Sequence, residues 1–153
     1  MKAALQGGGG IDELPSRLFQ EVREKRGLSY SVFASVGSFV DSGTVSVYAA
    51  TAPDRLAELR SVIDEQLAAL AEHGPGEREL EVARGGFEGA TVLGLEDTGS
   101  RMARLATNVL IRDRVVSVDE YLDAVRAVTA ADVQRVIGDV LAGPSAVSVV
   151  APG

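Results

Sequence analysis

Apolar and polar residues alternate in two neighbouring stretches near the start of the chain. The first, 28–36, has the period of a strand with one buried face. The second, 44–50, follows the turn signal Asp-Ser-Gly at 41–43. The two stretches predict a long antiparallel hairpin. One face of its first strand is expected to carry Leu28, Tyr30, Val32, Ala34 and Val36.

Helical periods surround this hairpin. A short helix is predicted over 17–26, with Ser16 as its N-cap and Gly27 where a glycine often ends a helix. Beyond the hairpin, apolar spacing and capping signals predict five longer helices. These helices are expected at about 53–72, about 77–95, after Thr98, after the capping box at 117–120, and after Thr129 with Asp132.

The same pattern makes three predictions about packing. The glycines at 85–86 interrupt a helix at a cost of ~1 kcal/mol each relative to Ala, so close packing is expected there. Residues 146–150 are expected to form a short buried strand. The helix after Thr98 is expected to point four residues inward: Met102, Leu105, Val109 and Leu110.

The order of elements predicts an α+β fold, an antiparallel sheet with helices packed on one face. The chain has 153 residues, of which 46% are apolar and 24% charged, and this suits one globular domain. No internal repeat is visible. We therefore expect a Gly-rich segment over 1–14 and a single α+β domain over 15–153.

Charge and cysteine content exclude several classes of function. A net charge of -7 argues against nucleic-acid binding and against electrostatic docking on anionic membranes. The absence of cysteine excludes disulfides and thiolate metal sites. There is no apolar run of the ~20 residues that span a bilayer and no secretory h-region. We expect a soluble cytoplasmic protein, although the sequence does not fix the compartment.

The chain lacks the usual signatures of an independent active site. Zinc peptidases need closely spaced histidines such as H-x-x-E-H, but His73 is the only histidine, and beside Gly74 it suits a helix end. There is no G-x-S-x-G elbow for a serine nucleophile. The glycine run 7–10 lacks the pattern of a phosphate-binding loop. No metal site is predicted, and a small-molecule enzyme built on His73 is disfavoured.

Arg23 and Tyr30 are the remaining candidates for chemistry. A helix that ends at Gly27 and turns back into a strand brings both side chains to one edge. A guanidinium and a phenol there can donate hydrogen bonds to a peptide carbonyl or an oxyanion. The alternative places Tyr30 in the core face of the strand and leaves Arg23 as a solvated helix residue. Spacing alone favours that alternative.

Residues 16–32, Ser-Arg-Leu-Phe-Gln-Glu-Val-Arg-Glu-Lys-Arg-Gly-Leu-Ser-Tyr-Ser-Val, closely resemble the C-terminal half of the pitrilysin/insulinase zinc peptidases. This family includes mitochondrial processing peptidase. The resemblance covers nearly the whole chain, from about Gly7 to Pro152. It continues in 39–43, 48–53, 95–102 and 128–133.

Family members have two homologous halves, or paired subunits, that enclose a chamber. The resemblance implies that zinc is held by H-x-x-E-H in the other half. It also implies that the zinc-free half supplies an Arg and a Tyr to hold substrate, matched here by Arg23 and Tyr30, which reverses the preference above. The glycine run, Gly7, Gly8, Gly9 and Gly10, matches a loop thought to receive substrate.

The family domain normally begins some dozens of residues before the glycines. The chain therefore resembles a truncated C-terminal domain with an unpaired sheet edge. Self-association, or a partner that completes the sheet, is expected.

Two functions follow from the resemblance. In the first, the chain is the substrate-binding, zinc-free lobe of a two-part metalloendopeptidase, inactive alone. Its partners are a peptide or protein substrate and a zinc-bearing homologous lobe or subunit, with a homo-oligomer as a further expectation. In the alternative, the chain is a non-catalytic interaction, assembly or regulatory module derived from that lobe.

Overall fold

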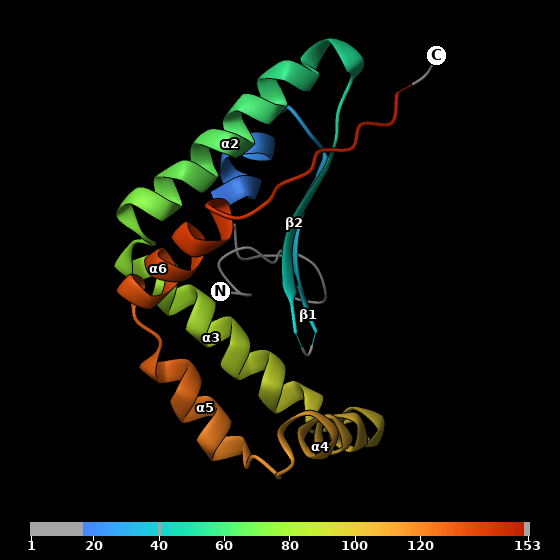
Figure 1. Ribbon diagram of the computed structural model, residues 1–153, viewed down its shortest axis with the longest axis vertical. Coiled ribbons are helices and arrows are strands. Elements are labelled where there is room, and N and C mark those ends of the chain that lie inside the picture. The colour runs from blue at the N-terminus through green and yellow to red at the C-terminus, as the bar shows by residue number, and fades with distance from the viewer. Residues whose placement is uncertain (1–16, 40, 152–153) are drawn as a thin grey trace.

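The computed structural model describes residues 17–39 and 41–151. Its elements confirm the predicted α+β fold, a hairpin followed by helices (Figure 1). The π-helical turn η1 and the 3-10 turn η2 are the two short elements. In chain order the elements are η1 Phe19–Glu24, β1 Ser31–Ser38, β2 Gly43–Ala50, η2 Pro53–Arg55, α2 Leu56–His73, α3 Glu77–Gly94, α4 Thr98–Arg112, α5 Val118–Ala127 and α6 Ala130–Leu141.

The hairpin has one face in the core and one face outside. β1 and β2 pair antiparallel, and the register sets Val32 opposite Ala49 and Ala34 opposite Val47. Val32 and Ala34 are buried. On the other face the rings of Phe33 and Tyr48 stack, with 5.0 Å between their centroids. The predicted alternation therefore holds from Val32 onward.

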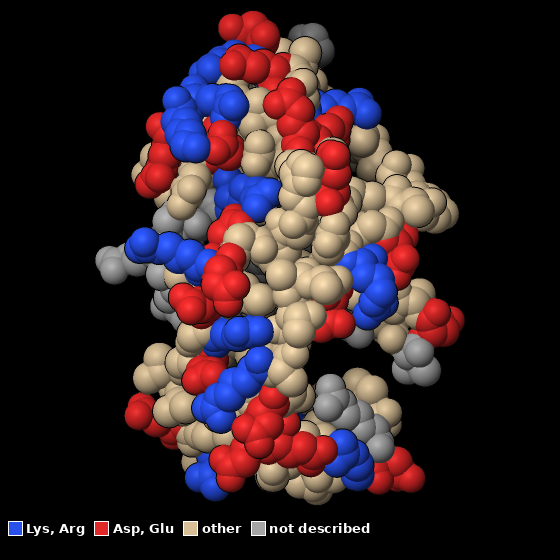
Figure 2. Space-filling view, turned by 90° about the vertical axis from the view of Figure 1, so that its left-hand side faces the viewer, with Lys and Arg blue, Asp and Glu red and all other residues tan. Residues whose placement is uncertain are grey.

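The core lies between the hairpin, η1, α2 and α6. α2 and α6 lie on the same side of the hairpin, and η1 lies between α2 and the strands (Figure 1). Ile137 of α6 and Val22 of η1 are the largest fully buried side chains. The helical side of the molecule carries charges of both signs interspersed over its surface (Figure 2), as expected for solvated helix faces. None of the helices in the described ranges combines the length and the apolar character needed to cross a membrane.

The helix boundaries follow the predicted caps. Ser117 Oγ accepts a hydrogen bond from Glu120 N at the start of α5. Thr129 and Asp132 form a reciprocal capping box that opens α6. These side chains satisfy backbone N–H groups that lack a partner inside the helix.

The predicted orientation of α4 is wrong. Its apolar side faces outward, and the side chain of Leu110 is 84% exposed. The polar side faces the protein instead: Asn108 is buried, and Arg104 donates to the carbonyls of Val116 and Ser117 at 3.0 and 2.9 Å. The other three residues predicted to point inward are exposed as well: Met102, Leu105 and Val109.

One further packing prediction is wrong, and another fails at one of its two residues. A Cβ added at Gly85 would meet no atom within 4 Å, so Gly85 itself is not closely packed. Residues 146–150 form no strand, and the side chains of Val147, Val149 and Val150 are exposed. A strand needs a neighbour for its backbone hydrogen bonds, and β1 and β2 pair only with each other in the described sheet.

These burial differences predict a large loss of stability for one truncation and almost none for another. Ile137→Ala is expected to lower the free energy of unfolding by about 2–5 kcal/mol, because it leaves a cavity at a position that is 1% exposed. Leu110→Ala is expected to change it by less than about 0.5 kcal/mol, because Leu110 buries little of its surface. Urea unfolding of both variants checks this. A large loss of stability in Leu110→Ala would mean that α4 packs inward after all.

Candidate functional site

η1 is anchored by apolar side chains that fix which way its other residues face. Leu18 and Val22 are buried in the core, and Val22 has no exposed surface. Lys25 N donates to Gln20 O at 2.9 Å, a π-type hydrogen bond. Burial of Val22 leaves Phe19 and Arg23 at the partly exposed edge of the turn.

A glycine corner joins η1 to β1. Gly27 has a φ of 55°, in the left-handed region that glycine adopts without a Cβ penalty. Gly27 N donates to Arg23 O at 3.0 Å, and Leu28 N donates to Val22 O at 2.8 Å. The predicted role of Gly27 is confirmed, and the corner directs the chain back across the end of η1.

The corner brings Arg23 and Tyr30 together. The guanidinium carbon of Arg23 lies 4.2 Å from the Tyr30 ring centroid and 4.7 Å from that of Phe19. Both contacts are within cation–π range. Each aromatic ring restricts the position of the guanidinium. The N–H groups point outward from the edge of the guanidinium plane. We call this three-residue arrangement the arginine stack.

The alternative that put Tyr30 in the core is wrong. Its side chain is 83% exposed. Regular pairing begins only at Ser31, so the alternation does not extend through the corner. Leu28 and Ser29 are both buried, and Tyr30 is displaced to the outside.

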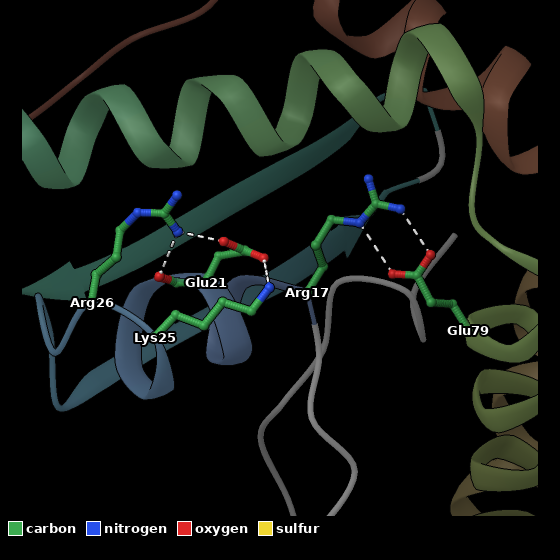
Figure 3. A network of polar contacts seen from close by, with 5 residues as sticks. All are labelled: Arg17, Glu21, Lys25, Arg26 and Glu79. Atoms are coloured by element: carbon green, nitrogen blue, oxygen red, sulfur yellow. Dashed lines mark hydrogen bonds and ion pairs between the residues drawn. The ribbon is translucent and has the colours of Figure 1, made fainter.

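One carboxylate of η1, that of Glu21, is paired with two other cations (Figure 3). Glu21 pairs with Lys25 at 2.5 Å and with Arg26. Hydrogen bonds from Lys25 and then Arg26 lower the pKa of Glu21. Within the described residues Arg23 makes no ion pair, so its charge remains available to a ligand.

A second carboxylate ties the start of η1 to α3. Arg17 donates through Nε and Nη2 to the two oxygens of Glu79, at 3.1 and 2.8 Å (Figure 3). Glu79 also accepts from Gly76 N at 2.8 Å, which caps α3. The hydrogen bond from Arg17 is the largest cause of the lowered pKa of Glu79, and the same interaction raises the pKa of Arg17.

The other candidate residues lie away from the arginine stack or outside the described residues. His73 ends α2, is exposed, and lies 3.7 Å from Glu72. No group of three or more His, Cys, Asp or Glu able to hold a metal occurs in residues 17–39 and 41–151. The glycines 7–10 and the predicted N-cap Ser16 lie outside the described residues.

Sequence reasoning missed three residues around the stack. Phe19 lies four positions before Arg23, the spacing of neighbours on a helix, and that spacing was a usable signal. Arg55 contacts Gly27 O, which lies 28 residues earlier in the sequence. Glu79 contacts Arg17, which lies 62 residues earlier. No local pattern reveals such pairs.

Comparisons with known proteins agree on one family of peptidases. The model of a family described as "Peptidase M16 inactive domain" matches residues 1–87. A Streptomyces coelicolor protein called an uncharacterized zinc protease is 43% identical over 145 residues, which are 95% of this chain and 31% of that protein. A Mycobacterium tuberculosis protein with the same description is 42% identical, over 95% of this chain and 32% of its own length. The chain thus spans about a third of these relatives.

Solved structures share the fold. A peptidase M16 inactive domain from Pseudomonas fluorescens has a TM-score of 0.75 at 21% identity, over 90% of this chain and 33% of that one. A conserved protein from Enterococcus faecalis has a TM-score of 0.72 at 23% identity, over 88% of this chain and 31% of that one.

The Arg17–Glu79 pair predicts a pH-dependent difference in stability. A lowered carboxyl pKa contributes stability above the unfolded value, 4.5, and that contribution is lost as the pH falls through the folded-state pKa. Glu79→Gln is therefore expected to lower Tm at neutral pH, and the difference from the unmodified chain should shrink in acid. Thermal melts over a pH series measure it.

Glu81→Gln is the matched control for this series, because Glu81 is exposed on the same helix and lacks a hydrogen bond or ion pair among the described residues. A Tm difference for Glu79→Gln that stays constant into acid would contradict the assigned role of the carboxylate.

Proposed function

Because the chain belongs to the M16 peptidase family and matches its inactive domain, we propose that it is a zinc-free lobe that binds extended peptides for a zinc-bearing partner lobe. The resemblance to the C-terminal, zinc-free domain of the pitrilysin/insulinase peptidases is thereby confirmed at the level of the family. Peptide binding, the partner and the residues that act are the proposal.

The arginine stack is the observation that carries this proposal. The guanidinium of Arg23 is held by two aromatic rings and makes no ion pair with a carboxylate among the described residues. A peptide carbonyl is a natural acceptor for its N–H groups, and the exposed hydroxyl of Tyr30 offers another donor. A hydrogen bond to a charged group contributes about 1.5–3 kcal/mol, enough to orient a bound chain.

The hairpin supports binding of an extended chain. In the described sheet each of β1 and β2 has one edge without a neighbour. An extended peptide can add to such an edge through main-chain hydrogen bonds. Tyr30 directly precedes β1, so a peptide paired along the free edge of β1 would pass close to the stack.

In this proposal the hydrolytic metal belongs to the partner. A bound zinc ion activates water and polarises the scissile carbonyl. The relatives called zinc proteases are about three times as long as the matched region, and such a length accommodates a second lobe. Arg23 and Tyr30 would hold the substrate carbonyl while the partner supplies the nucleophile.

Substitutions in the stack are expected to weaken peptide binding. The probe is fluorescein-labelled unfolded casein, and fluorescence anisotropy gives its Kd. Arg23→Met removes a charged donor and should raise Kd by about tenfold or more. Tyr30→Phe removes one neutral hydroxyl and should raise Kd by about two- to tenfold.

Arg60→Met is the matched control for this measurement. Arg60 is an exposed arginine on α2 whose only ion pair with another described residue is that with Asp64, at 3.7 Å. Its removal should leave the Kd unchanged. Casein should be bound without being cut, with or without added zinc. Unchanged affinity in both stack variants would remove the site assignment, and cleavage that a chelator abolishes would overturn the assignment of the metal to a partner.

One observation favours the alternative function, a non-catalytic assembly module. The apolar side of α4 faces outward, with Leu105 and Leu110 exposed, and α4 carries no acidic residue. Such a surface suits a protein contact. The two functions differ in what a zinc-bearing partner gains: a substrate lobe changes peptide cleavage through Arg23, whereas a module changes assembly without depending on Arg23.

Exposed apolar surface predicts self-association when no partner is present. Light scattering of the purified chain at micromolar concentration should give a mass above that of the monomer. The double variant Leu105→Glu, Leu110→Glu should shift the mass towards the monomer, because charges at these positions oppose burial. A strictly monomeric unmodified chain would contradict this expectation.

A further inference from the structure

The carbonyls of the glycine corner that follows η1 are bound by side chains from beyond the hairpin. Backbone carbonyls outside a helix or a sheet need hydrogen-bond partners elsewhere. Here Arg55 donates through Nη1 to Gly27 O at 2.8 Å and through Nη2 to Arg26 O at 3.2 Å. Thr51 Oγ1 donates to Leu28 O at 2.6 Å. Three successive carbonyls of the corner are thus bound by the segment that follows β2.

Ser29 adds a contact from within the corner. Its buried hydroxyl donates to Ala50 O at 2.7 Å and lies 2.8 Å from Ser31 O. These hydrogen bonds therefore hold the backbone on both sides of Tyr30. Because the Tyr30 side chain is 83% exposed, core packing does little to fix its position. The corner backbone and the contact with Arg23 determine where the ring lies.

We propose that Arg55 is a positioning residue for the arginine stack, with Thr51 as a second contact to the same corner. Among the described residues Arg55 makes no hydrogen bond or ion pair with Arg23 or Tyr30, and it acts through the carbonyls of Arg26 and Gly27. Its effect on peptide binding rests on the function proposed above. Its effect on the geometry of the stack does not depend on that function.

The chemistry of the contact suits arginine in particular. A guanidinium is a planar fork that donates to two carbonyls at once, and its charge strengthens both hydrogen bonds. Lysine presents a single ammonium and does not reproduce the fork. Glu58, in the first turn of α2, lies 3.5 Å from Nη2 and helps to orient the arginine. A purely capping role for Arg55 would affect stability alone, and this is the reading that the test must separate.

The test combines a spectroscopic and a binding measurement on Arg55→Met. NMR of the Arg23 side chain reports the ring-current shifts that the two aromatic rings impose on it. These shifts should move towards the values of a free arginine in Arg55→Met and stay unchanged in Arg60→Met. The Kd for unfolded casein should rise by about tenfold, the scale of one lost charge-assisted interaction.

A double-mutant cycle shows whether Arg55 acts through the stack. In an Arg23→Met background, Arg55→Met should raise the Kd by no more than about twofold, because the group it positions is already absent. Equal effects in both backgrounds would overturn the proposal, and so would unchanged Arg23 shifts in the folded Arg55→Met chain. If Arg23→Met itself leaves casein binding unchanged, Arg23 has no role in peptide binding, and the NMR shifts still decide whether Arg55 positions the stack.

Thr51 supplies a second pair of variants if Arg55→Met does not fold. Thr51→Val keeps the shape but loses the hydrogen bond to Leu28 O, whereas Thr51→Ser keeps the hydroxyl. Altered Arg23 shifts in Thr51→Val with normal shifts in Thr51→Ser support positioning through the corner. Identical spectra for both variants would oppose it.

Discussion

Burial of Val22 beneath α2 and the hairpin is the constraint on which the site depends. Val22 has no exposed surface, and Leu18, four positions earlier, is buried beside it. Fully burying a side chain of this size contributes roughly 1.5–3 kcal/mol, more than a single cation–π contact at a surface. The core therefore sets the rotation of η1. Arg23 lies at the outer edge because its neighbour in sequence must lie inside.

The distribution of carboxylates complements this constraint. The chain has a net charge of -7, so a free arginine would ordinarily meet an acidic partner. Glu21 is occupied by Lys25 and Arg26, and Glu79 is occupied by Arg17 and the start of α3. Other cations thus pair with Glu21 and Glu79, and the remaining acid of η1, the exposed Glu24, makes no ion pair with Arg23 among the described residues. The guanidinium of Arg23 remains at the edge of η1, held by two aromatic rings. Contact with these rings does not cancel the charge of the guanidinium.

Local signals predicted the elements that local chemistry determines. Ser117 and Thr129 cap helices through their own backbone neighbours, and Gly27 adopts a left-handed φ that other residues avoid. The nearness of Arg23 and Tyr30 followed from that corner. The exposure of Tyr30 did not, because the strand period fails where the chain turns and pairing has not begun. Arg55 contacts residues that precede it by 28 and 29 positions in the sequence, and only the folded chain brings them together.

The remaining errors share one physical cause. The inward prediction for Leu110 and the strand prediction for 146–150 both assumed that an apolar pattern finds its partner within the chain. Periodicity identifies which residues need to be covered, but it carries no information about which surface covers them. α4 turns the buried Asn108 towards its own protein and its leucines away, so the apolar pattern is intact while its expected neighbour is missing. A pattern that is sound in sequence and unsatisfied in structure is what a lobe built to meet another surface should show, and this applies to both functions considered for the chain.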